Sequence, residues 1–206
     1  MRTVLLFVAL ISFQINYAQK VVKKSIVDPD TSLIQIDATN CFQINLSTVD
    51  TDEVVIEATI DGEYRTDLLL SVQKKGGTLE IGTGFQPNFK NPNDKLSAHK
   101  VVSIALDIKL PFDQTVQVFG TNSNVDVVGA YKNLKVTLDD GHCHLYDIMT
   151  AAEIQTASGT IVVQSSSGFF EATSKYGTIK KENIPKGENR FILTSTTGDI
   201  EIRKTD

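Results

Sequence analysis

The C-terminal half of the chain repeats a short unit centred on a glycine. Each copy contains a strand-like stretch, a small polar turn and an aliphatic or small residue two places further on, and the four copies are centred on Gly141, Gly159, Gly177 and Gly198. The spacings are 18, 18 and 21 residues. A self-similar unit of about 20 residues without a helical period is typical of stacked β-solenoids. The repeat therefore favours a scaffold over an enzyme built around one pocket.

The copies align in apolar and polar columns. Apolar or small residues stand five places before and two places after each glycine: Val136, Ile154, Ala172 and Leu193, and Cys143, Ile161, Ile179 and Ile200. Polar residues stand four places before and one place after: Thr137, Gln155, Thr173 and Thr194, and His142, Thr160, Thr178 and Asp199. Side chains alternate between the two faces of a strand, so we expect the apolar columns to line a narrow core.

The glycines are expected to make the bend of each coil through a positive φ angle, which glycine adopts at little cost. Neighbouring coils are expected to stack in parallel register at roughly 4.8 Å. The chain ends in IEIRKTD, so the charges of Arg203, Lys204 and Asp206 would lie beside the open edge of the last coil and oppose edge-to-edge association.

Ahead of the repeats, residues 31–110 also show the two-residue rhythm of half-buried strands, for example in residues 54–60 and 102–110. The stretch 83–99 is polar, contains Pro87 and Pro92, and is predicted to be a long loop. The sequence thus predicts an N-terminal β region over residues 19–110 and β-helix repeats over 111–206.

The first 18 residues resemble an export signal. A short basic start, Met1 and Arg2, precedes the apolar run 4–11, and a plausible cleavage position lies near Ala18 and Gln19. No later stretch reaches 18 consecutive apolar residues, so the sequence argues against a transmembrane helix after residue 18. We expect export to the periplasm, the cell surface or the medium.

The charge of the chain narrows its possible partners. The formal net charge is −5 and no basic stripe occurs, which argues against nucleic acid as a partner.

Hydrophobic residues make up 41% of the chain, yet there is no Trp, so the core must be built from Val, Ile and Leu. The oligomeric state is left open.

Several stretches resemble a known family, the bacterial putative-adhesin β-strand-repeat proteins, which are common in Bacteroidetes and related to LiaG-like envelope proteins. They are EVVIEATIDGEY, GGTLEIG, VVSIALDIKLPFDQTVQVFGTNSNVDVVG, TASGTIVV, SKYGTIKK and TSTTGDIEI. The resemblance covers most of the mature chain and implies a right-handed, single-stranded parallel β-helix with an N-terminal β region, exported to the envelope. It carries no catalytic residue and implies no cofactor.

One copy, KVTLDDGHCHLYD, differs from the others. His142 and His144 stand two residues apart on a strand, beside Asp139 and Asp140, and could bind Zn²⁺ or Cu²⁺ if further ligands converged. A solvated strand face is the alternative interpretation.

Cys143 lies between these histidines. In an exported chain with two cysteines it could form a disulfide with Cys41, or both could be buried thiols.

Long β-helices also include polysaccharide lyases and hydrolases, which need a metal-bearing acidic cluster or a pair of carboxylates. The acids Asp126, Asp139, Asp140 and Asp147 show no such spacing, and no known catalytic motif occurs. The sequence therefore favours a non-catalytic adhesin-like protein that binds a glycan or an envelope protein through the polar column of Thr137, Gln155, Thr173 and Thr194. A metal-binding module and a small polysaccharide-active enzyme are the alternatives.

Overall fold

The computed structural model describes residues 19–28, 30–62, 66–89 and 102–205. Within these ranges the chain forms strands and turns but no helix, so none of the described segments is a helix that could cross a membrane. The predicted export signal, residues 1–18, lies outside the described residues. The prediction of an all-β chain is confirmed.

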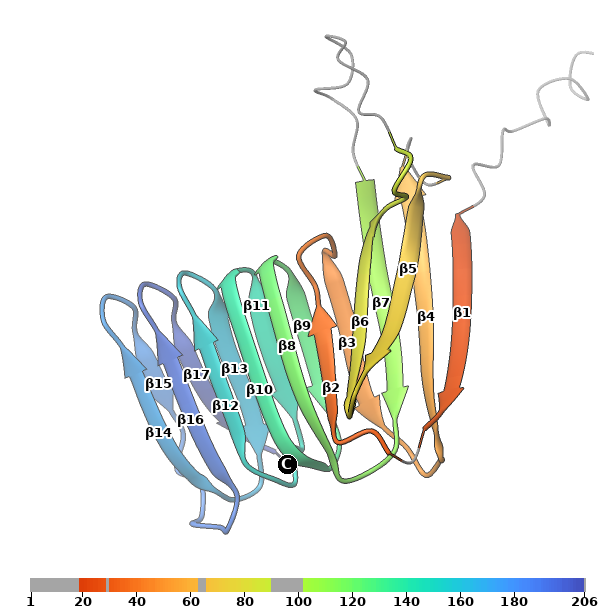
Figure 1. Ribbon diagram of the computed structural model, residues 1–206. Coiled ribbons are helices and arrows are strands. Elements are labelled where there is room, and N and C mark those ends of the chain that lie inside the picture. Colours follow the sequence, from red (N-terminus) through yellow and green to blue (C-terminus); the bar gives the residue numbers. More distant parts are fainter. Residues whose placement is uncertain (1–18, 29, 63–65, 90–101, 206) are drawn as a thin grey trace, which may run out of the picture.

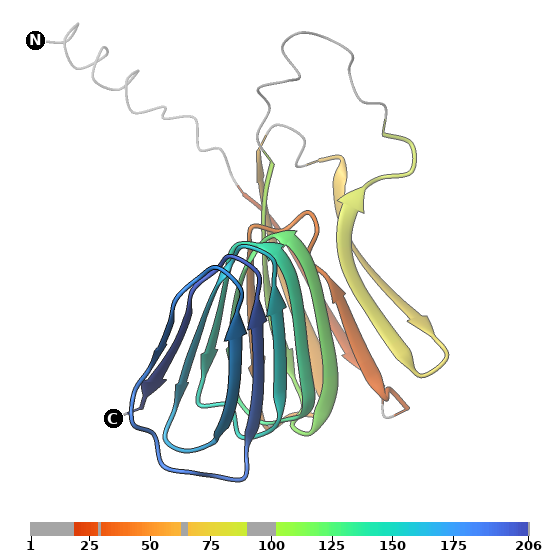
Figure 2. The same cartoon turned by 90° about the vertical axis from the view of Figure 1, so that its left-hand side faces the viewer.

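The strands form two mixed sheets that face each other (Figures 1 and 2). In spatial order, sheet A contains β1 (Lys20–Val27), β4 (Glu53–Gly62), β7 (Val102–Leu110), β3 (Gln43–Thr48), β9 (Asn124–Val128), β11 (His142–Tyr146), β13 (Thr160–Ser165), β17 (Ile200–Lys204) and β15 (Ile179–Lys181). Sheet B contains β14 (Phe169–Ser174), β16 (Arg190–Ser195), β12 (Ala152–Thr156), β10 (Tyr131–Asp140), β8 (Gln114–Asn122), β2 (Leu33–Asp37), β6 (Thr78–Phe85) and β5 (Leu68–Lys75).

From β8 onward the chain alternates between the sheets, one strand in sheet B followed by one in sheet A, and each such pair is one coil. The pair β2 and β3 forms a coil of the same kind, which pairs with β8 and β9 in parallel. Antiparallel pairing occurs at the N-terminal end, where β1, β4 and β7 are neighbours and β5 pairs with β6. The sheets are therefore mixed, whereas the sequence predicted a purely parallel β-helix in the repeat region. The right-handed winding and the domain boundary at residue 110 remain predictions.

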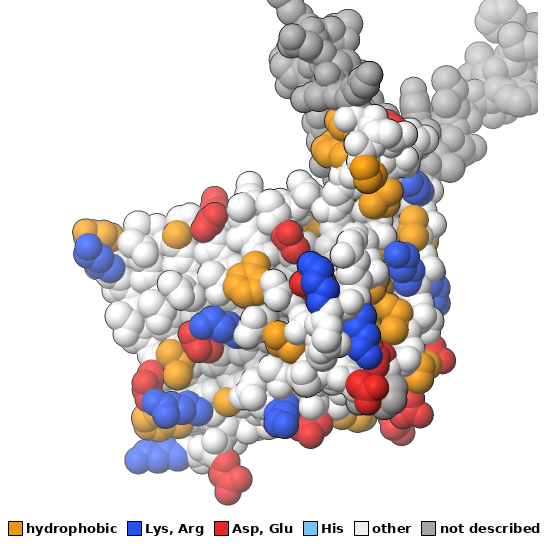
Figure 3. Space-filling view, in the orientation of Figure 1, with side chains coloured by type: hydrophobic (Ala, Val, Ile, Leu, Met, Phe, Trp, Pro, Cys, Tyr) orange, Lys and Arg blue, Asp and Glu red, His pale blue; other side chains and the backbone are white. Residues whose placement is uncertain are grey.

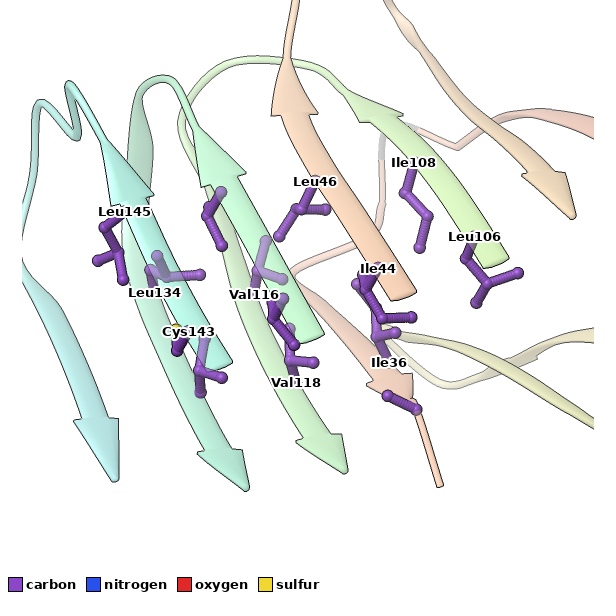
Figure 4. Packing of buried hydrophobic residues seen from close by; sticks show 14 of the residues in the cluster. Ile36, Ile44, Leu46, Leu106, Ile108, Val116, Val118, Leu134, Cys143 and Leu145 are labelled. Carbon is purple, nitrogen blue, oxygen red and sulfur yellow. The ribbon is translucent and has the colours of Figure 1, made fainter. Parts of the chain in front are cut away.

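The core lies between the two sheets and is continuous from β4 and β7 to β17. Inward-facing side chains such as Ile36 and Leu134 from sheet B lie near Ile44 and Leu145 from sheet A (Figure 4). The predicted apolar columns are in register: Val136 pairs with Ile154, and Ile154 with Leu193. Aliphatic side chains fill most of the narrow interior, as expected, but the largest fully buried side chains are the aromatic rings of Tyr131 and Phe191.

The order of the coils differs from the expected one. The last coil, β16 and β17, lies between β12 and β14 in sheet B and between β13 and β15 in sheet A. The expectation that Arg203 and Lys204 flank the open edge is therefore wrong, since β17 has a partner on both sides, and Asp206 lies outside the described residues. The exposed end is formed by β14 and β15.

Burial of apolar surface explains this order. Leu193 and Ile202 of the last coil are almost fully buried, whereas the matching positions of the end coil hold Ala172 and Lys181. A coil in the middle of a stack is covered on two sides, and burying a large aliphatic side chain contributes about 1.5–3 kcal/mol. The coil with the larger side chains therefore gains most from the inner place. At the end, the Lys181 ammonium lies 5.2 Å from the centre of the Phe170 ring, which stacks on Phe191.

The repeat glycines lie directly above one another, in the order Gly141, Gly159, Gly198 and Gly177. A Cβ on Gly159, Gly198 or Gly177 would lie 3.1, 2.7 or 2.6 Å from the carbonyl carbon of its neighbour, and closer still to that carbonyl oxygen. Only Gly141 of the four has a positive φ, 99°. The expectation of a positive φ is thus wrong for the other three, where glycine is required because the turns approach too closely for any side chain.

Buried hydroxyl groups hold these turns together. The Thr156 hydroxyl donates to the Gly159 carbonyl at 2.7 Å and lies 2.9 Å from the Ser195 hydroxyl, which accepts the Gly198 amide at 2.9 Å. In the end coil the Ser174 hydroxyl donates to the Gly198 carbonyl at 2.8 Å. These bonds satisfy groups that would otherwise be buried without a partner.

Lysines close the other end of the stack. Lys20 and Lys24 of β1, in sheet A, donate from Nζ to the carbonyls of Leu68 and Leu70 of β5, in sheet B, at 2.7 and 3.0 Å. β1 was not expected from the sequence, because its lysines interrupt the apolar alternation. The predicted loop 83–99 begins later than expected, since residues 83–85 belong to β6, and residues 90–101 lie outside the described part of the chain.

Cys41 and Cys143 are both buried and form no disulfide. The Cys41 thiol lies 3.4 Å from the Thr83 hydroxyl, and burial raises its pKa to about 11. Burial also raises the pKa of Cys143, which faces the core between the sheets (Figure 4). The alternative of two separately buried thiols is therefore the one found.

We expect Gly159→Ala to destabilise the protein strongly, because the new methyl group would meet the carbonyl of Gly141. Overpacking of this kind costs about 1–3 kcal/mol or more, or a melting point lowered by about 2–4 °C per kcal/mol. Gly84→Ala is the matched control, since a Cβ there meets nothing within 4 Å. Thermal and urea unfolding measure both. Equal stability of the two variants would contradict the close approach of the turns.

We expect both thiols to be silent toward a disulfide reagent at pH 8 in the native protein, because they are buried and protonated. In denaturant both should react, giving two equivalents of thiol per chain. The raised pKa also has a consequence for stability, because the fold favours the neutral form of Cys41. The contribution of this thiol to the free energy of unfolding is therefore complete below pH 9 and is lost as the pH rises toward 11. Absence of free thiol in the denatured, unreduced protein would show a disulfide instead.

Candidate binding face

The outer side of sheet B is a broad polar surface, here called the sheet B face. Two neighbouring rows of outward-facing residues cross all eight strands. The first is Ser71, Gly82, Asp37, Phe119, Thr137, Gln155, Thr194 and Thr173. The second is Gln73, Glu80, Gln35, Gln117, Lys135, Glu153, Ile192 and Glu171. The predicted column of Thr137, Gln155, Thr173 and Thr194 is thus a continuous part of the first row.

The polar groups of this face are unevenly satisfied. Its glutamates have cationic partners: Lys75 with Glu80, Lys135 with Glu153 and Arg190 with Glu171, each at 2.7 Å. By contrast, the side-chain amides of Gln35, Gln117 and Gln155 and the hydroxyls of Thr137, Thr173 and Thr194 form no hydrogen bond with another described residue. In Figure 3, which views this side, most of the surface is uncharged, and blue and red groups lie next to each other. The face therefore offers free hydrogen-bonding groups with little net charge.

Two hollows lie on the sheet B face. The larger, here called the β6 trough, measures about 450 Å³ and lies over β2, β6 and β5, with Gln35, Asp37, Ser71, Gln73, Glu80 and Phe85 in its lining. The second measures about 370 Å³ and lies over β8, β10, β12 and β16. Gln35 of the first and Gln117 of the second are register partners, so the two hollows lie on neighbouring strands.

On the opposite side, the outer face of sheet A carries the two histidines. His144 Nδ1 lies 3.3 Å from Asp126 and 3.1 Å from the Tyr146 hydroxyl, and Gln43 donates to Asp126 at 2.7 Å. Further along this sheet, the hydrogen bond from Arg203 holds the pKa of Glu201 below its ordinary value. The side chains around His144 therefore form a connected polar set on this face: Gln43, Asp126, His144 and Tyr146.

The metal site considered for the histidines lacks converging ligands. The ring centres of His142 and His144 are 6.2 Å apart. Asp140 accepts the amide of Gly141 at the turn and does not join the histidines. Among the described residues no group of three or more His, Cys, Asp or Glu could hold a metal ion.

Part of the sheet B face was missed at the sequence level. The polar column was traced only through the four glycine copies, while Gln35, Asp37, Gln117 and Phe119 belong to coils without the repeat glycine. Their alternation was the available signal: LIQID and TVQVF show the same inward and outward pattern as KVTLD. At the glycine position the coil of β8 and β9 has Ser123, whose hydroxyl is buried against the carbonyls of Ala38 and Cys41 at 2.9 and 2.7 Å.

No protein-family model matches the sequence, and no curated protein matches it. Among solved structures, the chain is similar to a protein from Clostridium sporogenes described as a putative cell adhesion protein. The identity is 14%, the match covers 91% of this chain and all of that one, and the TM-score is 0.67. A protein from Bacteroides fragilis described as a putative adhesin matches with 16% identity over 91% of this chain and 98% of its own, at a TM-score of 0.41.

At this level of identity, the likeness to the Clostridium sporogenes protein shows a shared fold. It extends over nearly the whole chain, so the two mixed sheets described above are the common architecture.

Proposed function

We propose that the chain is an exported, non-catalytic adhesin-like protein, a right-handed β-helix that binds a glycan or a protein at the cell envelope. The observation that carries the proposal is the sheet B face, where amide and hydroxyl groups stand free of protein partners across neighbouring strands. The fold shared with a protein described as a putative cell adhesion protein supports the proposal, as does the export signal predicted for residues 1–18.

The layout of these groups suits a long or repeating partner better than a small substrate. Neighbouring strands lie about 4.8 Å apart, so equivalent side chains recur at that interval along a row. Each amide can both donate and accept hydrogen bonds, and each hydroxyl can do the same. A partner that lies across the strands would meet many weak contacts rather than one strong one, which is the chemistry of adhesion.

We expect Gln117→Ala to weaken binding about two- to tenfold, since one hydrogen bond contributes about 0.5–1.5 kcal/mol. The measurement is a screen of the protein over a glycan array and an envelope fraction, followed by titration of the partner found. Gln164→Ala on the sheet A face is the matched control, because Gln164 is also a half-buried glutamine whose side-chain amide forms no hydrogen bond with another described residue. Equal loss in both variants, or no partner in either screen, would contradict the proposal.

A further inference from the structure

The β6 trough exists because the β5 and β6 hairpin separates from the rest of sheet B at one end. β6 pairs with β2 only as far as Gly82, whereas its ladder with β5 continues to Phe85. Figure 2 shows this hairpin, in yellow, diverging from the neighbouring strands. Asn40 bridges the gap by donating to the Thr83 carbonyl at 3.0 Å. The separation leaves a concave surface instead of a flat sheet.

Glycines keep the floor of the trough bare. Gly82 and Gly84 point outward on the central strand of the three, and neither has a positive φ. A Cβ on Gly84 would meet nothing within 4 Å, and one on Gly82 would make ordinary contact with Asp37 at 3.4 Å. Unlike the glycines of the stacked turns, these two are not required by packing. Glycine weakens a strand interior, and it often marks a place where a ligand approaches the backbone closely.

The lining combines polar groups with apolar surfaces. Gln35 presents a free amide, and Gln73 donates to the Ser71 hydroxyl at 3.2 Å. Phe85, 43% exposed, belongs to the lining and stacks on Phe89 with ring centres 4.2 Å apart, while Phe119, 37% exposed, lies beside the trough as the register partner of Asp37. A sugar ring has hydroxyls that donate and accept and a face of C–H groups that packs on an aromatic ring. The lining matches both parts of such a ring.

The charge of the trough selects among sugars. Its lining contains the carboxylates of Asp37 and Glu80 and no lysine or arginine. Lys75 pairs with Glu80 from outside the lining, while Asp37 accepts hydrogen bonds from Thr39. An anionic sugar would meet a like charge and no cation among the described residues of the lining, which disfavours it. An uncharged sugar can use the carboxylates as hydrogen-bond acceptors.

We propose that the β6 trough is the binding subsite for a neutral oligosaccharide, with Gly82 and Gly84 as its floor, Gln35 and Asp37 as hydrogen-bonding groups and Phe85 as the apolar edge. This inference rests on the proposed adhesin-like function and gives its ligand class. A longer chain leaving the trough past Gln35 would meet Gln117 and the second hollow. No covalent step is involved.

The test uses the whole chain and a set of hexasaccharides. The neutral probes are hexamers of glucose, mannose, galactose and N-acetylglucosamine, and the anionic probes are a galacturonate hexamer and a heparin hexamer. We expect at least one neutral probe to bind and to shift the amide resonances of Gly82 and Gly84, with both anionic probes at least tenfold weaker. Gly84→Leu should weaken binding of the neutral probe at least tenfold, because its side chain fills the trough from a position with open space around it.

Gln164→Leu is the matched control, since it adds an aliphatic side chain at a half-buried position on the sheet A face, away from the trough, and should leave binding unchanged. Asp37→Asn should reduce the discrimination against galacturonate by removing the like charge. The unfolding transition of each variant is measured, so that loss of binding is separated from loss of fold.

Failure of all neutral probes to bind, or binding that survives Gly84→Leu, would overturn the subsite. If an envelope protein then binds and is lost in Gln117→Ala but kept in Gln164→Ala, the proposed function stands without a sugar subsite. Tighter binding of an anionic probe than of every neutral one would overturn the assigned ligand class.

Discussion

The close approach of successive turns is the constraint on which the rest of this structure depends. At Gly141, Gly159, Gly198 and Gly177 the backbone of one coil lies against the carbonyl of the next, with no room for a side chain. This contact fixes the register of both sheets at once, because the strands on either side of the turn belong to different sheets. Once the turns are stacked, the apolar columns meet across the core and the polar rows align on the outside.

Much of the fold could be predicted from the sequence, because apolar and polar residues alternate along each strand. Val136 and Ile154 face inward as expected, and Thr137 and Gln155 lie side by side on the outer face. The order of the coils could not be read from spacing alone, since it depends on a comparison between distant segments. Lys181, which stands in an otherwise aliphatic column with Ile202, and Ala172, which stands in a column with Leu193, were the local signs that their coil lies at the end.

The binding face shows why a site of this kind is hard to find in a sequence. The β6 trough combines residues from three strands that are far apart in the chain, and its floor is formed by the absence of side chains at Gly82 and Gly84. Glycine in a repeat protein suggests turns, so two glycines inside a strand attract little notice. Only the open space around Gly84, set against the crowding at Gly159, separates the two uses of the same residue.

The place of the last coil has a consequence for how the chain reaches its native state. β14 and β15 have no neighbour to pair with until β16 and β17, the final strands, have been made. Repeat proteins in which each coil adds to the one before can fold from one end as the chain emerges. Here β16 and β17 must insert between the coil of β12 and β13 and the coil of β14 and β15. The end coil, β14 and β15, therefore reaches its native pairing only after residues 190–204 have been made, although both of its strands precede them in the chain.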